Sequence, residues 1–437
     1  MSPVDDFLRN VLRSGLLDRE QLQKSLRTLP RDRREDVNAI KEHLIQQKAL
    51  TRFQVFKISQ GITLGLTLGP YRLLVPLGRG GMGTVYLAID SRSGQYIALK
   101  ILPPKVARQE ERLLARFRRE MELSQKIQHP HLARTIEAGA FLNIHHIAME
   151  FIPGQTLYRV VMDEGPLPIG RAAHLFAEVA AALGQAHAQG VIHRDMKPSN
   201  IMVTPHDHAK VLDLGLAYTE GEVVEDIDVV GGKGYIVGSI DYMAPEQTRD
   251  STAVDARADL YALGCCLYFA LTGKPPFPDG PLMARVRAHR AEVPASLHDR
   301  NPDVPETFAA IVHRLLAKNP ADRFASAGEL VKVLEAWSVA PTQALEAPGD
   351  PAVEEEIRKL TDGWMVAETA VKDASEDALL FRIDAEVKSA GPEFLSRSIF
   401  DEIDRVQPHV WLLAVVVIWV VVLMCCILGT CVASFAK

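Results

Sequence analysis

A glycine-rich segment followed at once by two strand-like stretches restricts the fold of this chain more than any other feature. Gly78, Gly80 and Gly83 have the spacing GxGxxG, which lets backbone N–H groups approach phosphate oxygens where a Cβ would intrude. Dinucleotide-binding folds use the same spacing, but there it opens a helix ahead of an acidic ribose contact. Here TVYLAID, a turn SRSG and QYIALKIL follow, which predicts a hairpin. The segment therefore predicts a phosphate-binding loop carried by a hairpin.

The second strand of this hairpin carries a lysine. Residues two apart in a strand share a face, so Ala98 and Lys100 point together beneath the loop and Val85. We expect Ala98 and Val85 to bracket a flat base and Lys100 to reach the phosphates. A solvated strand lysine is the alternative for a lysine considered alone. In the following helix Glu120 lies nearer the apolar stripe than Glu122, so Glu120 is the predicted partner of Lys100.

A second group of polar residues follows a helix-rich stretch. The segment VIHRDMKPSNIMV at 191–203 places Asp195, Lys197 and Asn200 between two apolar ends, and Asp213 follows in a turn that Gly215 permits. Together with the glycine segment, IALK at 97–100 and APE at 244–246, these motifs resemble in order the set of the eukaryotic-like (Hanks-type) serine/threonine protein kinases of bacteria. The resemblance extends over residues 71–337.

The resemblance implies ATP and Mg²⁺ as cofactors and assigns roles to single residues. Asp195 is expected to accept the hydrogen bond of the substrate hydroxyl, Lys197 to neutralise the γ-phosphate, and Asn200 and Asp213 to bind Mg²⁺. The nucleotide-binding residues are expected to be Leu77, Gly78, Arg79, Gly80, Gly81, Met82, Gly83, Thr84, Val85, Ala98, Lys100, Glu120, Glu150 and Ile152. The last two belong to the segment that matches the family's hinge, whose backbone would pair with adenine.

Three further residues match structural positions of the family. Glu246 and Arg323 match its buried ion pair, and Asp259 matches the helix residue that anchors the catalytic loop. Lys197 after the HRD aspartate is the serine/threonine pattern, and Ser239 stands in place of the family's Gly-Thr hydroxyl, so protein serine and threonine hydroxyls are the expected acceptors.

The segment between Asp213 and Glu246 departs from the family pattern because few hydroxyls lie in it. One hypothesis is that acidic residues supply a negative charge constitutively (Glu222, Glu225, Asp226 or Asp228). The other is that Thr219 is the single phosphorylated switch, paired with Arg194. A solvated acidic loop without a role is the third interpretation.

The expected fold class is α+β, a bilobal kinase with a β-rich N-lobe and a helical C-lobe. A small helical domain is predicted at 1–66, the kinase domain at 71–337, an acidic linker at 338–408, and a transmembrane helix at 410–432 with a short tail at 433–437. The segment 410–432 carries no charge and at 1.5 Å per residue would extend about 35 Å, enough to cross a bilayer. A buried core helix is the alternative for it.

Composition excludes several other classes. A net charge of -6 without a basic face gives no indication of nucleic-acid binding. The five cysteines lie in apolar runs without metal-ligand spacing, so neither disulfides nor zinc are expected. The start of the chain lacks a signal-peptide pattern, and a domain that consumes ATP must face the cytoplasm, so we expect a single-pass membrane protein with its kinase domain there. A homodimer is compatible with the family, although the apolar segment lacks GxxxG.

Two other functions remain open. One alternative is a pseudokinase scaffold, which would bind nucleotide without transferring its phosphoryl group, although the chain retains every catalytic residue of the kinase motifs. The other alternative is a membrane-tethered recruiter. In that case deletion of 1–66 would remove partner binding and leave kinase activity intact.

Overall fold

The strand-rich stretch after residue 66 forms one antiparallel sheet. The computed structural model describes residues 3–80, 83–102, 126–141, 144–212, 218–219, 240–248, 254–341, 343–345 and 350–364. The sheet has the order β1-β2-β3-β4-β6-β5, with β1 at Thr67–Leu68, β2 at Tyr71–Gly80, β3 at Gly83–Asp90, β4 at Tyr96–Ile101, β5 at Thr135–Phe141 and β6 at Ile144–Glu150. Along β4 the apolar side chains of Ile97, Leu99 and Ile101 share one buried face, which packs on the core. This sheet is the expected β-rich lobe.

The first sixty residues form helices, and the last of them packs directly on this sheet. They are α1 (Pro3–Arg13), α2 (Arg19–Leu26), α3 (Val37–Gln46) and α4 (Arg52–Ser59). Thr51 caps α4 in a capping box with Gln54. Strand β2 has a register irregularity between Leu73 and Val75. At this point the side-chain amide of Gln54 donates to the carbonyl of Leu73 at 2.6 Å, and the Thr51 hydroxyl donates to the carbonyl of Leu74 at 2.6 Å. Helix α4 therefore satisfies carbonyls that the bulged strand leaves outside its ladder.

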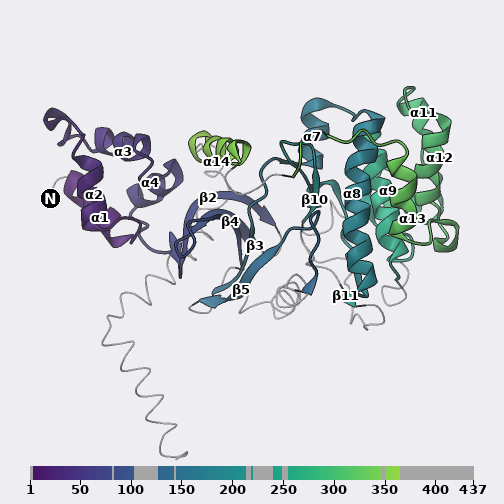
Figure 1. Cartoon of the computed structure of the whole chain (residues 1–437), viewed down its shortest axis with the longest axis horizontal. Helices are drawn as coiled ribbons and strands as arrows, with labels where there is room; N and C mark the ends of the chain where they lie inside the picture. The colour runs from purple at the N-terminus through teal and green to yellow at the C-terminus, as the bar shows by residue number, and fades with distance from the viewer. Residues whose placement is uncertain are drawn as a thin grey trace, which may run out of the picture. The chain divides into compact units, whose positions relative to one another are not determined.

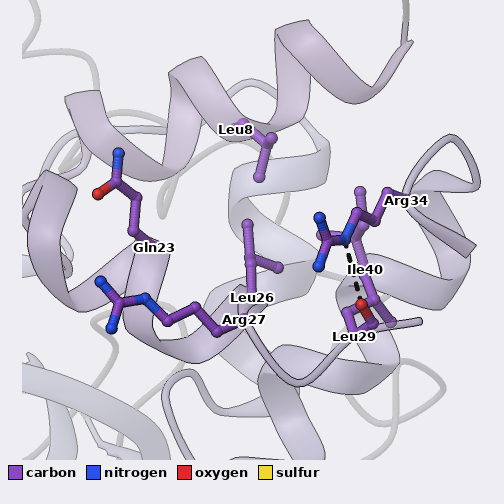
Figure 2. Close-up of a pocket in the computed structure, with 7 residues that line it drawn as sticks. All are labelled: Leu8, Gln23, Leu26, Arg27, Leu29, Arg34 and Ile40. Atoms are coloured by element: carbon purple, nitrogen blue, oxygen red, sulfur yellow. Dashed lines mark hydrogen bonds between the residues drawn. The ribbon is translucent and has the colours of Figure 1, made fainter. Parts of the chain in front are cut away.

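The N-terminal helices also line an open pocket of about 420 Å³, shown in Figure 2. Its apolar lining is Leu8, Leu26, Leu29 and Ile40, and its polar lining is Gln23, Arg27 and Arg34. Arg34 is held in place because its Nε donates to the carbonyl of Leu29 at 3.1 Å. None of these residues belongs to the predicted nucleotide or catalytic set.

The second lobe is helical and is built around α8 (Ile169–Ala188) and α9 (Arg257–Thr272). Helix α9 is buried along nearly its whole length, in keeping with its apolar sequence, and α8, α9 and α13 lie side by side in Figure 1. The other elements are β7 (Gln155–Thr156), α7 (Leu157–Glu164), β8 (Val191–Ile192), β9 (Ile201–Val203), β10 (Ala209–Val211), β11 (Tyr218–Thr219), α10 (Leu282–Ala291), α11 (Leu297–Arg300), α12 (Glu306–Leu315) and α13 (Ala327–Glu335), with short 3₁₀ turns at Arg31–Arg33, Pro198–Asn200, Ile240–Tyr242 and Pro320–Asp322. The two lobes match the expected α+β kinase architecture.

The described residues beyond the kinase domain, at 338–341, 343–345 and 350–364, are more ordered than a linker would be. We call residues 338–341 and 343–345 the strap. The N–H of Val339 in the strap donates to Gly170 at the start of α8, and α14 (Pro351–Gly363) then lies beside α4 and β2 (Figure 1). Trp364, at the end of α14, contacts the rings of Phe53 and Phe56 at centroid distances of 5.4 and 5.5 Å. The expected linker from 338 onward is thus partly replaced by a packed segment, because Trp364 finds apolar partners far away in the sequence.

Among the helices of the described ranges, none combines the length and apolarity needed to cross a membrane. The predicted span at 410–432 lies outside those ranges.

Candidate active site

The glycine segment forms the end of the β2–β3 hairpin. Gly78 pairs with Val85, Arg79 with Thr84, and Gly80 with Gly83. Gly83 has φ +137°, and a Cβ there would lie 2.0 Å from the carbonyl oxygen of Ile101, so β4 requires a glycine at this position. A Cβ on exposed Gly78 would meet no described atom within 4 Å, which leaves open space beside the strand. The described part of the hairpin therefore fits a phosphate-binding loop, whereas Gly81 and Met82 lie outside the described residues.

The predicted lysine lies under this hairpin. Lys100 is 4 % exposed and stands opposite Val85 on β3 and Ile147 on β6. Ala98, two residues earlier on the same face, stands opposite Leu87 and Met149. The sheet thus brings Lys100, Ala98 and Val85 together as the spacing predicts. The predicted partner Glu120 lies outside the described residues.

The hinge segment follows β6. Ile152 is buried and Leu77 of β2 is half-buried, as apolar walls of a base-binding site would be. The Glu150 carboxylate accepts from Lys210 Nζ at 2.7 Å and from the N–H of Arg134 at 3.0 Å. The side chain of Glu150 therefore joins β6 to β10 and to the start of β5, a structural role that the motif comparison did not reveal.

The catalytic loop between β8 and β9 brings three predicted residues together. Lys197 Nζ donates to Asp195 Oδ2 at 2.5 Å, and Asn200 Nδ2 donates to the carbonyl oxygen of Asp195 at 2.8 Å. The side chains of Asp195 and Lys197 are 16 % and 24 % exposed, so both remain open to a substrate. The N–H of Leu212 donates to the carbonyl of Asn200 at 2.8 Å, which places the chain just before Asp213 beside Asn200. Asp213 itself lies outside the described residues.

A buried carboxylate on α9 holds this loop in place. Asp259 accepts from the consecutive N–H groups of His193 and Arg194 at 2.9 and 2.8 Å, and it contacts His187 Nε2 at 2.7 Å. Burial raises the pKa of Asp259, but the hydrogen bond with His187, the nearby histidine charges and the His193 N–H together hold the pKa below its ordinary value. Arg194 has φ +64°, a strained conformation that the two hydrogen bonds stabilise. The predicted anchoring role of Asp259 is confirmed.

The predicted ion pair of the C-lobe is also present. Arg323 donates to both carboxylate oxygens of Glu246, at 2.6 and 2.8 Å, and its side chain is fully buried. Gln247, which sequence reasoning missed, donates to the carbonyl of Arg194 at 2.9 Å and so links the APE segment to the catalytic loop. Sequence reasoning also missed His187, because no motif spacing distinguishes it from an ordinary residue near a helix end.

The comparisons with known proteins agree with this geometry. The family model described as "Protein kinase domain" matches residues 71–334, more than half of the chain. The chain therefore belongs to the protein kinase family.

Three relatives illustrate the likeness. Serine/threonine-protein kinase PknB of Mycolicibacterium smegmatis is 37 % identical over 264 residues, which are 60 % of this chain and 41 % of that protein. PknD of Mycobacterium tuberculosis is 38 % identical over 61 % of this chain and 39 % of its own length. Serine/threonine-protein kinase pkn3 of Myxococcus xanthus is 37 % identical over 61 % of this chain and 49 % of its own length. The matched region spans less than half of each relative.

Proposed function

We propose that this chain transfers the γ-phosphoryl group of Mg-ATP to serine and threonine hydroxyls of other proteins. The observation that carries the proposal is the catalytic loop, in which Asp195, Lys197 and Asn200 are joined by hydrogen bonds and held by buried Asp259. Phosphoryl transfer through a loose transition state requires mainly positioning and neutralisation of charge. A fixed, partly exposed carboxylate beside an ammonium group supplies both.

Each described residue has a definite task in this reaction. Asp195 orients the attacking hydroxyl and takes up its proton late in the reaction. Lys197 supplies positive charge beside the transferred group. The β2–β3 hairpin and Lys100 would hold the phosphates, while Asn200, together with Asp213, would hold Mg²⁺; the metal ion supplies charge neutralisation at the phosphates.

A transfer assay on the full-length chain tests this proposal. The chain is incubated with labelled ATP, Mg²⁺ and a protein rich in serine and threonine, and the labelled amino acids are identified. We expect phosphoserine and phosphothreonine, and a loss of rate of about 100-fold or more in Asp195→Asn. Asp303→Asn, a change of an exposed aspartate in the turn before α12, is the matched control and keeps the wild-type rate. Binding of Mg-ATP without any transfer would support the pseudokinase scaffold instead.

We also propose that residues 410–432 tether the kinase domain to the inner membrane, with that domain in the cytoplasm. The absence of charge over this segment supports the proposal. Expressed in bacteria, the full chain is expected in the alkali-resistant membrane pellet, and a chain ending at residue 409 in the supernatant. An N-terminal epitope is expected to resist protease in intact spheroplasts. Equal amounts of both chains in the supernatant would contradict the tether.

A further inference from the structure

A cluster of histidines and one glutamate lies outside the residues assigned to catalysis. His174 and Glu178 are one turn apart on α8, and His208 reaches them from the turn between β9 and β10. The three side chains are 11 %, 10 % and 12 % exposed. Their candidate ligand atoms lie within 4.8 Å of one another. Two elements distant in the sequence thus bring two imidazoles and a carboxylate to one point.

The hydrogen bonds of His208 require a proton or a metal ion between its ring and Glu178. Its Nε2 is 2.8 Å from the carbonyl oxygen of Gln343, which only accepts, so Nε2 carries the proton. Its Nδ1 then faces Glu178 Oε1 at 2.6 Å. In a neutral ring protonated on Nε2, the Nδ1 atom carries a lone pair, which would repel a carboxylate oxygen at this distance. Either a second proton or a metal ion must therefore lie between them.

His174 supplies a second nitrogen directed at the same carboxylate. The residue is 9 % exposed, and its Nδ1 is 3.2 Å from Ser338 Oγ. Its Nε2 is buried and 3.2 Å from Glu178 Oε1, yet it makes no hydrogen bond with any described residue. Buried nitrogens are almost always hydrogen-bonded, so one that points at a carboxylate without a hydrogen bond indicates a missing partner.

We propose that His174 Nε2, His208 Nδ1 and the Glu178 carboxylate bind one Zn²⁺ ion. Zinc bonds of about 2.0–2.2 Å in a tetrahedron separate ligand atoms by about 3.3–3.5 Å. The His174–Glu178 distance is close to this value, and the His208–Glu178 distance needs to open by less than about 1 Å. Two histidines and a glutamate are an established zinc ligand set, with solvent in the fourth position. Cysteine spacing does not indicate this site, because its ligands are two histidines and a glutamate from segments distant in the sequence.

The outer contacts of the site support the assignment and suggest its effect. Metal-binding histidines usually donate their other ring N–H to a carbonyl or another polar oxygen, which fixes the tautomer. Here those oxygens are Ser338 Oγ and the Gln343 carbonyl, and both belong to the strap. Zinc would therefore fasten the strap to α8 and the β9–β10 turn, and through it the segment that leads to α14.

Zinc titration of the full-length chain tests the site. The protein is purified without a polyhistidine tag, freed of metal by chelation and titrated with Zn²⁺ in competition with a chromophoric chelator, without nucleotide. We expect one ion per chain in the wild type. Glu178→Gln and His208→Gln are each expected to weaken binding at least about 100-fold, and Ser338→Ala, which removes only an outer contact, about 10-fold. His298→Gln, a change of an exposed histidine on α11, is the matched control and binds as the wild type does.

A second measurement keeps the test valid if a ligand variant folds poorly. Co²⁺ added to wild type and to Ser338→Ala is expected to give the visible absorption of a tetrahedral site, and hydrogen exchange at residues 338–345 is expected to slow when Zn²⁺ is added. Absence of zinc binding to the wild type would mean that a proton bridges His208 and Glu178, and the proposal would fail. It would also fail if His208→Gln bound zinc as tightly as the control.

Discussion

Arg323→Ala should lower the stability of the kinase domain strongly, because this arginine is the most connected buried cation described. Besides Glu246, its guanidinium donates to the carbonyl oxygens of Ala317 and Arg257, each at 2.8 Å, and of Lys318 at 3.3 Å. It also lies 4.8 Å from the ring centroid of Tyr261. Truncation to alanine removes every one of these contacts at once.

The magnitude follows from what the truncation leaves behind. Breaking a buried ion pair from one side costs about 3–5 kcal/mol, since the remaining charge stays buried. The Glu246 side chain is 17 % exposed, so water reaches it in part and the loss lies near the lower end, about 3 kcal/mol. For a domain of this size each kcal/mol lowers Tm by roughly 2–4 °C, so Tm should fall by roughly 6–12 °C.

Thermal unfolding of wild type and variant, followed by circular dichroism, measures this. The control is Arg358→Ala, which removes an arginine of α14 that is 58 % exposed and paired with Glu355 on the same helix. An exposed pair is worth at most about 1 kcal/mol, so this Tm should change by no more than a few degrees. Equal Tm values for the two variants would refute the reasoning that the buried pair supports the C-lobe.

Three other changes test separate parts of the structure. Trp364→Ala should remove the contacts of α14 with α4, cost about 3 kcal/mol, and speed proteolysis after residue 350. Burial lowers the pKa of His289 to about 3, so between pH 6.5 and 3 this histidine gains a proton only in the unfolded chain. The free energy of unfolding, measured with urea, should therefore fall by about 2 kcal/mol between pH 7 and 5, and His289→Gln should lack this loss. Gly83→Ala should abolish the rise in Tm caused by Mg-ATP, since its Cβ would collide with the carbonyl of Ile101; an unchanged rise would contradict that contact.

The catalytic loop was predictable because its residues lie close together in the sequence. Asp195, Lys197 and Asn200 fall within six positions, so their spacing already restricts how they can meet. Asp259 and the pair of Glu246 with Arg323 are far apart, and only the family resemblance identified them. Physical reasoning from the sequence alone would have treated each as an ordinary charged residue.

The packing of the strap and of α14 was not predictable for a different reason. The sequence after residue 337 is rich in proline, alanine and acidic residues, which by itself favours a linker. Its order comes from a few single contacts, such as Val339 with Gly170 and Trp364 with Phe53. Isolated contacts of this kind leave no periodic pattern, so local reasoning cannot find them.

The packing of α4 on β2 also changes how the N-terminal helices are understood. Under the alternative of a membrane-tethered recruiter, deletion of 1–66 removes partner binding and leaves catalysis intact. The structure instead shows that α4 satisfies the carbonyls of Leu73 and Leu74 and covers Tyr86 with Phe53. The deletion would expose these groups on the strand that continues into Leu77–Gly80, and buried carbonyls without donors destabilise a sheet. Loss of activity in such a truncation would therefore reflect a damaged phosphate loop as much as a lost partner. Recruitment is better tested by changing Arg27 or Gln23, which line the pocket of the N-terminal helices (Figure 2).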